Sequence, residues 1–398
     1  MSETRHRRRE VESAAALQRH IDAGDDLGRH VIQGVDLTGI TGLQGARLRG
    51  ALLTGCRFAD AQQEALVRAR GGLAFPRFAE LPYRPYRTAL YSVDELMEGY
   101  DDGGYTGTLD FAIYAHAHRE RHHPGGISAY ESLAERIHDH AIDDALMEYL
   151  EAHRGRGVVG VMGGHGTPRS DPAFARVARV TWELTRRGYL VVTGGGPGVM
   201  EAGNLGAWFA GHDDPAVLER ALGELAVADT FDGGHEEGTP DYLEAIRAYL
   251  HAARQVVERH AGAGFRPGVS LAVPTWFYGH EPSNLFSSAV AKYFANSIRE
   301  EGLLAIARAG VIYAPGSAGT MQEIFQDLCQ NHYATYGWRS PMVLLGARRY
   351  AAEHELMRAF VARSGAGYGE LLALLDDPLE VVRFIEQHPP REAARRTP

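Results

Sequence analysis

Short apolar runs alternate with helical patterns between about residues 157 and 390. Each run is apolar at consecutive positions, so both faces of the strand that it predicts are expected to be buried. A parallel sheet with helices on both faces meets that requirement. The pattern therefore predicts an α/β fold with a doubly wound sheet, whose strands are 157–162, 189–193, 270–275, 311–315 and 341–346.

The segment between the first two predicted strands has a clear helical pattern. Asp171 is placed to cap a helix, and Pro172 suits the first helical position. One face of this helix is expected to carry Phe174, Val177, Ala178, Thr181 and Leu184, and Gly188 is expected to end it. A further helix is predicted over 199–210, and a helical insertion near 213–265 is expected to lie outside the sheet.

A repeat of five residues distinguishes the N-terminal part of the chain. Large apolar side chains recur at Leu43, Leu48, Leu53 and Phe58, and smaller ones lie two positions earlier at Thr41, Ala46, Ala51 and Cys56. This spacing resembles the pentapeptide-repeat family, whose members form β-helical coils. The other interpretation is an irregular glycine-rich segment in which the spacing arises by chance.

These patterns together predict five regions. We expect an N-terminal arm and helix over 1–34, a pentapeptide-repeat-like segment over 35–60, and a linker with a helical accessory region over 61–154. A Rossmann-like domain follows over 155–390, and 391–398 form a tail.

Composition narrows the function classes. The net charge of -10 argues against broad nucleic-acid binding, and no apolar run reaches the roughly 18 residues that a membrane helix needs. The two cysteines, Cys56 and Cys329, match no metal-ligand spacing. Without a signal-peptide pattern, they favour a reduced, cytoplasmic setting. We expect no metal and no cofactor.

The loops after the predicted strands are the places to search for a ligand site, because open parallel sheets bind ligands at the carboxyl ends of their strands. Four of these loops have unusual sequences: GGHGTPRSD, GGGPGVMEAGN, WFYGHEPSN and PGSAGTMQE. In the second loop, Gly194–Gly198 leave the backbone amides accessible to an anion at a helix start. The other interpretation is a tight turn that needs positive φ.

Two familiar nucleotide motifs do not fit this loop. A dinucleotide fingerprint needs a third glycine where Val199 stands, and an acidic residue where the strand ends in Thr193. A P-loop needs Gly-Lys followed by Ser or Thr, which the chain lacks.

In the fourth loop, Thr320 and Glu323 admit two interpretations. Their spacing is that of a capping box, in which the glutamate reaches back to a backbone amide. The same carboxylate could instead meet a ligand. The local sequence does not decide between capping and chemistry.

Taken together, GGGPGVMEA and PGSAGTMQE resemble the GGGxxGxM and PGGxGTxxE motifs of the Lonely Guy family, long described as lysine decarboxylases. The resemblance covers roughly residues 155–390 and is nearest to the larger bacterial nucleotide 5′-monophosphate nucleosidases. It implies a phosphoribohydrolase that cleaves a nucleoside 5′-monophosphate to free base and ribose 5-phosphate, and a homodimer or larger homo-oligomer. Ser317 replaces the second glycine of the family motif, and only Arg299, beside Glu300, approximates the family's Arg-Lys pair.

The resemblance also implies roles for individual residues. Glu323 is expected to stabilise an oxocarbenium-like state and to orient water. Arg299 is expected to contact phosphate or the leaving base, from a helix face shared with Lys292 and Asn296. The 5′-phosphate is expected on Gly316, Ser317, Gly319 and Thr320.

The sugar and base are expected to face the other loops. Substrate-binding residues there are Gly194, Gly195, Gly196, Gly198, Met200, Glu201, Gly164 and His165. Glu201 would supply a second carboxylate, bonded by Asn204, or would only compensate the helix dipole. One aromatic of Trp276, Tyr278 and His280 could stack on the base, although local packing is the more common role of such residues.

Two rival functions remain to be weighed. A non-catalytic nucleotide sensor would use the same phosphate site, with the N-terminal region as its output. An amino-acid decarboxylase would need a lysine for pyridoxal phosphate, and Lys292, the one lysine of the chain, has no supporting motif. We therefore reject the decarboxylase.

Overall fold

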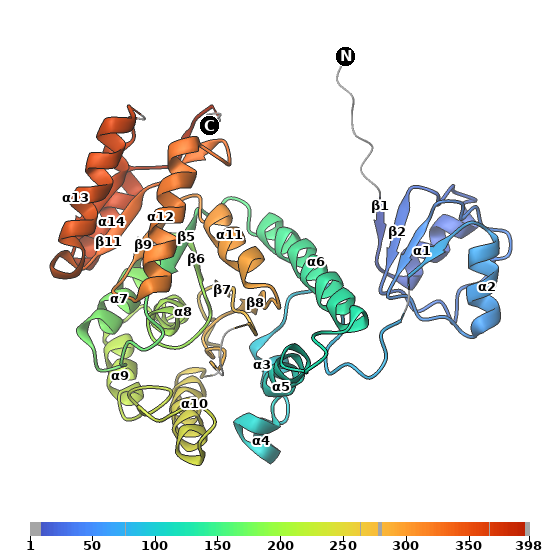
Figure 1. Ribbon diagram of the computed structural model, residues 1–398, viewed down its shortest axis with the longest axis horizontal. Coiled ribbons are helices and arrows are strands. Elements are labelled where there is room, and N and C mark those ends of the chain that lie inside the picture. The colour runs from blue at the N-terminus through green and yellow to red at the C-terminus, as the bar shows by residue number, and fades with distance from the viewer. Residues whose placement is uncertain (1–8, 76, 263, 278–280, 366, 395–398) are drawn as a thin grey trace. The chain divides into compact units, whose positions relative to one another are not determined.

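The computed structural model describes residues 9–394 except 76, 263, 278–280 and 366 (Figure 1). The chain divides into two compact units. One contains the described residues up to Ala89 together with Pro124–Glu148, and the other contains Leu90–His123 and the chain from Tyr149 onward. The long helix α6 (Ala129–Ala152) carries the chain from the first unit into the second.

The first unit contains a parallel sheet of short strands in the order β1-β2-β3-β4. Val31 pairs with Leu52 and Leu52 with Leu73, so successive strands lie 21 residues apart in the sequence. Leu43, Leu48 and Leu53 are buried in its core, whereas Phe58 is only partly buried. The elements are β1 (Arg9–Val11), α1 (Ala14–Asp22), β2 (His30–Gln33), β3 (Leu52–Thr54), α2 (Ala61–Ala69) and β4 (Leu73–Ala74).

This coil is longer than the segment that the five-residue repeat predicted. The repeat over 35–60 covers about one turn, while the parallel pairing runs from Arg9 to Ala74. The spacing of five also occurs earlier, at the buried residues Leu27, Ile32 and Leu37, but the step from Leu37 to Leu43 is six residues. This shift, together with the helices α1 and α2, interrupts the repeat outside 35–60.

The second unit contains a seven-stranded parallel sheet in the order β12-β11-β9-β5-β6-β7-β8. The α/β prediction, a Rossmann-like sheet with helices on both faces, is confirmed. Its strands are β5 (Val158–Met162), β6 (Leu190–Thr193), β7 (Ser270–Ala272), β8 (Ala289–Val290), β9 (Gly310–Tyr313), β11 (Met342–Leu345) and β12 (Leu372–Leu375). A small antiparallel pair, β10 (Trp338–Arg339) and β13 (Arg391–Glu392), lies outside this sheet.

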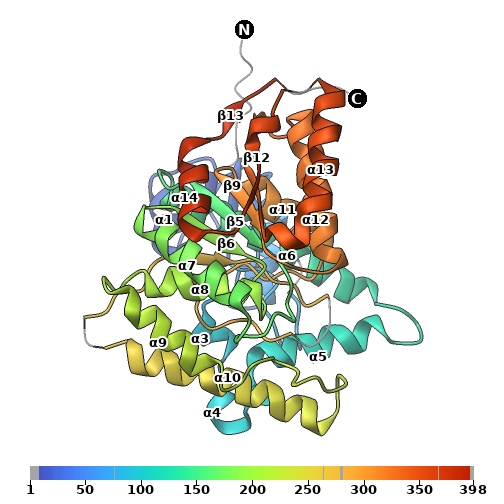
Figure 2. The ribbon, with the colours of Figure 1, turned by 90° about the vertical axis from the view of Figure 1, so that its left-hand side faces the viewer.

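Helices cover the sheet on both faces (Figure 2). On one face lie α7 (Pro172–Arg186), α8 (Val199–Phe209) and α14 (Pro378–Gln387), and on the other lie α11 (Asn296–Ile306), α12 (Ala318–Tyr333) and α13 (Ala347–Ser364). The insertion forms α9 (Pro215–Leu225) and α10 (Pro240–His260), which pack on each other. None of the helices in the described part of the chain is long and apolar enough to cross a membrane.

The helix after β5 follows the sequence prediction closely. Asp171 accepts a hydrogen bond from the Ala173 amide at 2.7 Å, and Pro172 is the first residue of α7. All five side chains of the predicted face are buried.

The predicted helix that placed Lys292 beside Arg299 is wrong in its first part. Residues 289–290 form β8, and α11 begins only at Asn296, because the Ala289–Val290 pair completes the sheet edge next to β7. Lys292 therefore shares no helix with Arg299. It is buried and donates to both oxygens of Asp110, at 2.7 and 3.0 Å.

Asp110 belongs to a segment that we expected in the accessory region. Residues 90–123 instead pack with the sheet unit. They form α3 (Val93–Leu96), α4 (Tyr100–Gly103), the short 3-10 turn Tyr105–Gly107 and α5 (Leu109–Arg121). Because a buried ion pair is costly to leave unmatched, the Asp110–Lys292 contact ties α5 to the sheet.

The strand order changes direction between β5 and β9. From β5 the chain proceeds through β6 and β7 to β8 at one edge, and it then returns through β9 and β11 to β12 at the other. The loops after β5 and β9 therefore flank the switch point, which is where sheets of this kind bind ligands.

Candidate functional site at the switch point

A cavity of about 560 Å³ lies at this switch point. Its described lining comes from the loops after β5, β6, β7 and β9, together with the first turns of the following helices. The lining residues are Gly163, Gly164, His165, Gly194, Gly196, Met200, Pro274, Thr275, Glu281, Pro282, Ser283, Arg299, Glu300, Ser317, Ala318, Gly319, Thr320, Gln322 and Glu323.

Gly164 joins three of these loops through its backbone. Its amide donates to the carbonyl of Pro315 at 3.0 Å, and its carbonyl accepts from the amide of Val199 at 3.1 Å. The two glycine-rich loops therefore face a common space, although they do not end neighbouring strands, because β5 lies between β6 and β9.

The loop after β9 ends three residues earlier than a capping box at Thr320 would require. Ser317 is the N-cap of α12, and its side chain makes no capping hydrogen bond. Thr320 is then the third residue of the helix and Glu323 the sixth. Since a capping glutamate belongs at the third position, the capping interpretation of Glu323 is wrong.

The start of α12 is open to the cavity. Ser317, Ala318 and Gly319 are exposed, and their amides lie at the positive end of the helix. Gly316 is not part of the cavity lining, because it packs on Thr320: a Cβ there would lie 2.2 Å from the Thr320 hydroxyl oxygen. Of the four residues expected to hold a phosphate, Ser317, Gly319 and Thr320 line the cavity and Gly316 does not.

Glu323 lies mostly buried at the side of the cavity, with 13% of its side chain exposed. Burial raises the pKa of its carboxyl to about 7, with a smaller raising effect from Glu300, while Arg299 lowers the pKa. The nearest guanidinium nitrogen of Arg299 is 3.7 Å away. This carboxyl can therefore exchange a proton near neutral pH.

Arg299 is held by its own helix. Its Nε and Nη2 donate to Asn296 Oδ1 at 3.1 and 2.8 Å. Asn296 and Gln322 both donate to Glu300 at 3.2 Å. The guanidinium thus stands beside Glu323 in a fixed orientation, as a cation at the cavity wall.

Asp327 is a buried carboxylate that the sequence reasoning missed. It lies one turn beyond Glu323 on α12, and the Tyr313 hydroxyl donates to it at 2.8 Å. Burial raises the pKa of its carboxyl to about 7 as well. The spacing of four residues between Glu323 and Asp327 was the available signal.

In the second glycine loop, two of the four glycines face the cavity and two do not. Gly194 and Gly196 line the cavity, whereas Gly195 and Gly198 adopt positive φ values of 75° and 66° and do not. A Cβ on Gly198 would lie 2.4 Å from the carbonyl oxygen of His165. Both interpretations of the loop therefore hold for different glycines, two of them lining the cavity and two making the turn.

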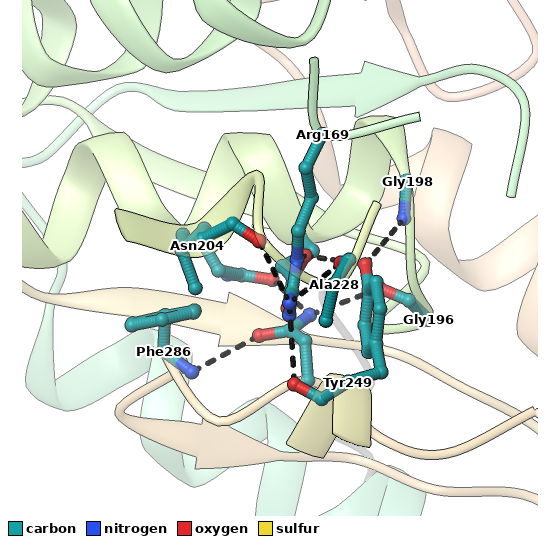
Figure 3. Close-up of polar contacts among 10 residues, drawn as sticks. Arg169, Gly196, Gly198, Asn204, Ala228, Tyr249 and Phe286 are labelled. Atoms are coloured by element: carbon teal, nitrogen blue, oxygen red, sulfur yellow. Dashed lines mark hydrogen bonds and ion pairs between the residues drawn. The ribbon is translucent and has the colours of Figure 1, made fainter. Parts of the chain in front are cut away.

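Glu201 does not line the cavity, contrary to our expectation. Only 1% of its side chain is exposed, and Arg169 Nε and Nη2 donate to its two oxygens at 2.8 and 2.6 Å. Tyr249 of the insertion stacks on the Arg169 guanidinium at 3.3 Å, and its hydroxyl donates to Glu201 (Figure 3). The carboxylate is fully engaged in holding the insertion and the loop together.

The same network reaches the glycine loop from behind. The amide of Gly198 donates to the Tyr249 hydroxyl at 3.4 Å (Figure 3). Arg169 Nη1 also donates to the carbonyls of Ala228 and Tyr249, each at 3.2 Å. We expected the insertion to lie outside the sheet, and it contributes no strand, but it braces the site.

The side chain of Asn204 was expected to bond to Glu201, but its hydrogen bonds are to other residues. Its Oδ1 accepts from Thr193 at 2.7 Å and from Asn284 at 2.9 Å, and its Nδ2 donates to Ser270 at 3.0 Å. Asn284 also donates its side-chain amide to the Gly196 carbonyl at 3.3 Å. This second buried network fixes the cavity face of the loop.

Two further side chains meet at the cavity from different loops. His165 Nδ1 lies 2.8 Å from Glu281 Oε1, and both residues line the cavity. Trp276 is buried and donates to Asp110, so it is part of the core. Tyr278 and His280 lie outside the described residues.

No protein-family model matches the chain. No curated protein matches it either.

Among the solved structures that resemble this chain, the three named next each cover 58% of it. They are the molybdenum cofactor binding protein from Rippkaea orientalis (13% identity, 96% of that chain, TM-score 0.33), the Moco carrier protein from Chlamydomonas reinhardtii (16%, 96%, 0.34) and TM1055 (18%, 99%, 0.32). Scores and identities this low give no argument for a particular activity.

Proposed function

We propose that the switch-point cavity binds a nucleoside 5′-monophosphate and hydrolyses its N-glycosidic bond to free base and ribose 5-phosphate. One observation carries the proposal. The carboxyl of Glu323 lines the same cavity as the exposed start of α12 and the cavity-facing glycines of the second loop. An anion site and an acidic group with a pKa of about 7 therefore share one space.

The first step is binding of the phosphate. The amides of Ala318, Gly319 and Thr320 have no partners within the helix, and the helix dipole favours an anion beside them. A phosphate held there places its ribose about one turn along α12, next to Glu323. A cavity of this volume is in the range of small-molecule sites.

The second step is cleavage. As the bond from C1′ to the base nitrogen breaks, positive charge develops on the ribose, and an ionised Glu323 stabilises it and accepts a proton from the attacking water. Arg299 balances the negative charge of the phosphate and of the carboxylate from its fixed position. The bound phosphate thereby supplies the energy that positions the sugar.

A panel of nucleoside 5′-monophosphates, incubated with the purified protein, tests the proposal. Chromatography should detect free base and ribose 5-phosphate in equal amounts for at least one nucleotide. Absence of both products across the common purine and pyrimidine nucleotides would refute the hydrolase.

The substitution Gly196→Asp tests whether the second glycine loop contacts the nucleotide. A Cβ at Gly196 would lie 2.9 Å from Met200 Cε and 3.2 Å from Glu281 Oε2, so an added carboxylate meets both bulk and like charge. We expect loss of nucleotide binding by calorimetry. Gly223→Asp on α9, where a Cβ meets nothing within 4 Å, is the control and should bind normally.

A nucleotide sensor remains the second candidate, and one feature favours it. Ser317 adds a side chain to the phosphate loop where the family motif has its second glycine, so the loop is more crowded. The side chain is exposed, which limits the crowding. Tight nucleotide binding without any base release would select the sensor. We further propose a homodimer or larger homo-oligomer, which sedimentation measurements on the purified protein would test.

A further inference from the structure

The pair formed by His165 and Glu281 has no role in the steps above. The two residues come from the loops after β5 and β7 and meet at the cavity, with 54% and 28% of their side chains exposed. Glu281 Oε2 also lies near Gly196, on the side of the cavity formed by the second glycine loop. This is the region left for the base when the phosphate lies at the start of α12.

The contact between these residues also fixes which ring nitrogen is available. Nδ1 of His165 is engaged by Glu281 at 2.8 Å, so Nε2 is the atom that can meet a ligand. A carboxylate on Nδ1 orients the imidazole and stabilises its protonated form, as carboxylates do in histidine-based catalytic sites.

We infer that His165, oriented by Glu281, is the acid that protonates the departing base. This inference rests on the proposed hydrolysis and adds the leaving-group half of the reaction. His165 would be a catalytic residue, and Glu281 a positioning residue that acts through it.

The step balances in atoms and charge. The electrons of the bond between C1′ and the base nitrogen pass to the base, and the proton on His165 Nε2 moves to a nitrogen or oxygen of that base. The water oxygen bonds to C1′, and one water proton passes to Glu323. Glu323 then releases its proton and His165 regains one from solvent, so the net reaction consumes only nucleotide and water.

The electrostatic surroundings agree with this role. The hydrogen bond to Glu281 raises the pKa of His165, with a further raising effect from Asp232, against a lowering effect of burial. His165 therefore keeps its proton to higher pH than an isolated histidine. Phe231 packs edge-on against its ring at 6.0 Å.

A substrate whose leaving group needs no proton tests the inference. In 4-nitrophenyl riboside 5′-phosphate the phosphate and ribose are unchanged, but 4-nitrophenolate departs without acid assistance. We expect His165→Asn to lose about 10²- to 10⁴-fold in kcat on the best nucleotide, the usual contribution of an acid catalyst, but only a few-fold on the nitrophenyl substrate. Glu323→Gln should lose activity on both.

Further variants distinguish a failure of the acid role of His165 from a failure of the proposed hydrolysis. Glu281→Gln should resemble His165→Asn in a weaker form, and His251→Asn, on the exposed side of α10, should leave both activities unchanged. Equal losses of His165→Asn on both substrates would overturn the acid role while leaving the hydrolase intact. If the wild-type protein cleaved neither substrate, the proposed hydrolysis itself would fail, and this inference with it.

Discussion

Two glutamates follow the two glycine loops in nearly identical sequence settings, yet the structure gives them opposite environments. Glu201 follows GGGPGVM and Glu323 follows PGSAGTMQ, each near the start of a helix. Glu201 is buried with both oxygens bonded to Arg169, whereas Glu323 lines a cavity with its nearest cation 3.7 Å away. One carboxylate is structural and the other is available for chemistry.

The position within each helix explains the difference. Glu201 is the third residue of α8, where its side chain points beneath the loop toward Arg169 and the insertion. Glu323 is the sixth residue of α12, one turn further along, and so lies beside whatever occupies the helix start. Glu201 on α8 thus holds the glycine loop in place, whereas Glu323 on α12 faces the cavity.

The largest expected effect is that of Glu323→Gln on activity. Removing the ionisable group should reduce kcat for base release by about 10³-fold or more, as for the loss of a catalytic carboxylate, while nucleotide affinity changes little. Steady-state kinetics and calorimetry measure the two quantities. Full activity of the Glu323→Gln variant would mean that neither glutamate takes part in the reaction, and it would contradict the comparison.

The second effect is that of Glu201→Gln on stability. Breaking a buried ion pair leaves Arg169 uncompensated, and we expect a loss of about 3–5 kcal/mol in the free energy of unfolding. Urea denaturation measures it. Glu219→Gln, which breaks the half-exposed pair with Arg179, is the control and should cost less than about 1 kcal/mol. Similar losses for the two variants would contradict the account.

The third effect is the pH dependence of stability. The folded-state pKa of Glu323, about 7, exceeds the ordinary value of 4.5, so its contribution to stability is present below about pH 4.5 and is lost as pH rises through 7. Glu323→Gln should therefore gain stability relative to wild type between about pH 5 and 8, by up to about 3 kcal/mol. Urea denaturation of both proteins at about pH 5 and about pH 8 measures this gain. If the difference in unfolding free energy between variant and wild type were the same at both pH values, the buried environment assigned to Glu323 would be contradicted.

The smallest effect is expected from Ser317→Gly. The Ser317 side chain is exposed and makes no capping hydrogen bond, so its loss should alter KM only a few-fold and leave kcat unchanged. A large change in kcat would show that the hydroxyl takes part in the reaction.

The sheet and the location of the site could be predicted from the sequence because both depend on local patterns. Continuous apolar runs indicated five strands, and the glycine loops at their ends marked the cavity. Two of the seven strands, β8 and β12, were missed. The two-residue strand β8 was missed because Val290 also fits a helical pattern that continues to Ile298.

The environments of the charged residues could not be predicted in the same way. Arg169 lies 32 residues from Glu201 and Asp110 lies 182 residues from Lys292, so no local spacing indicates either pair. Whether Glu323 caps a helix or faces a cavity depends on the residue at which α12 begins. Sequence propensities locate a helix end only to within a few residues, so they could not decide between the two roles.

A crystal structure of Glu323→Gln with its preferred nucleoside 5′-monophosphate tests the central claim most directly. We predict the phosphate on the amides of residues 318–320 and C1′ of the ribose facing the substituted side chain at position 323, with the base toward His165. A nucleotide bound elsewhere, or a phosphate distant from the start of α12, would contradict the account.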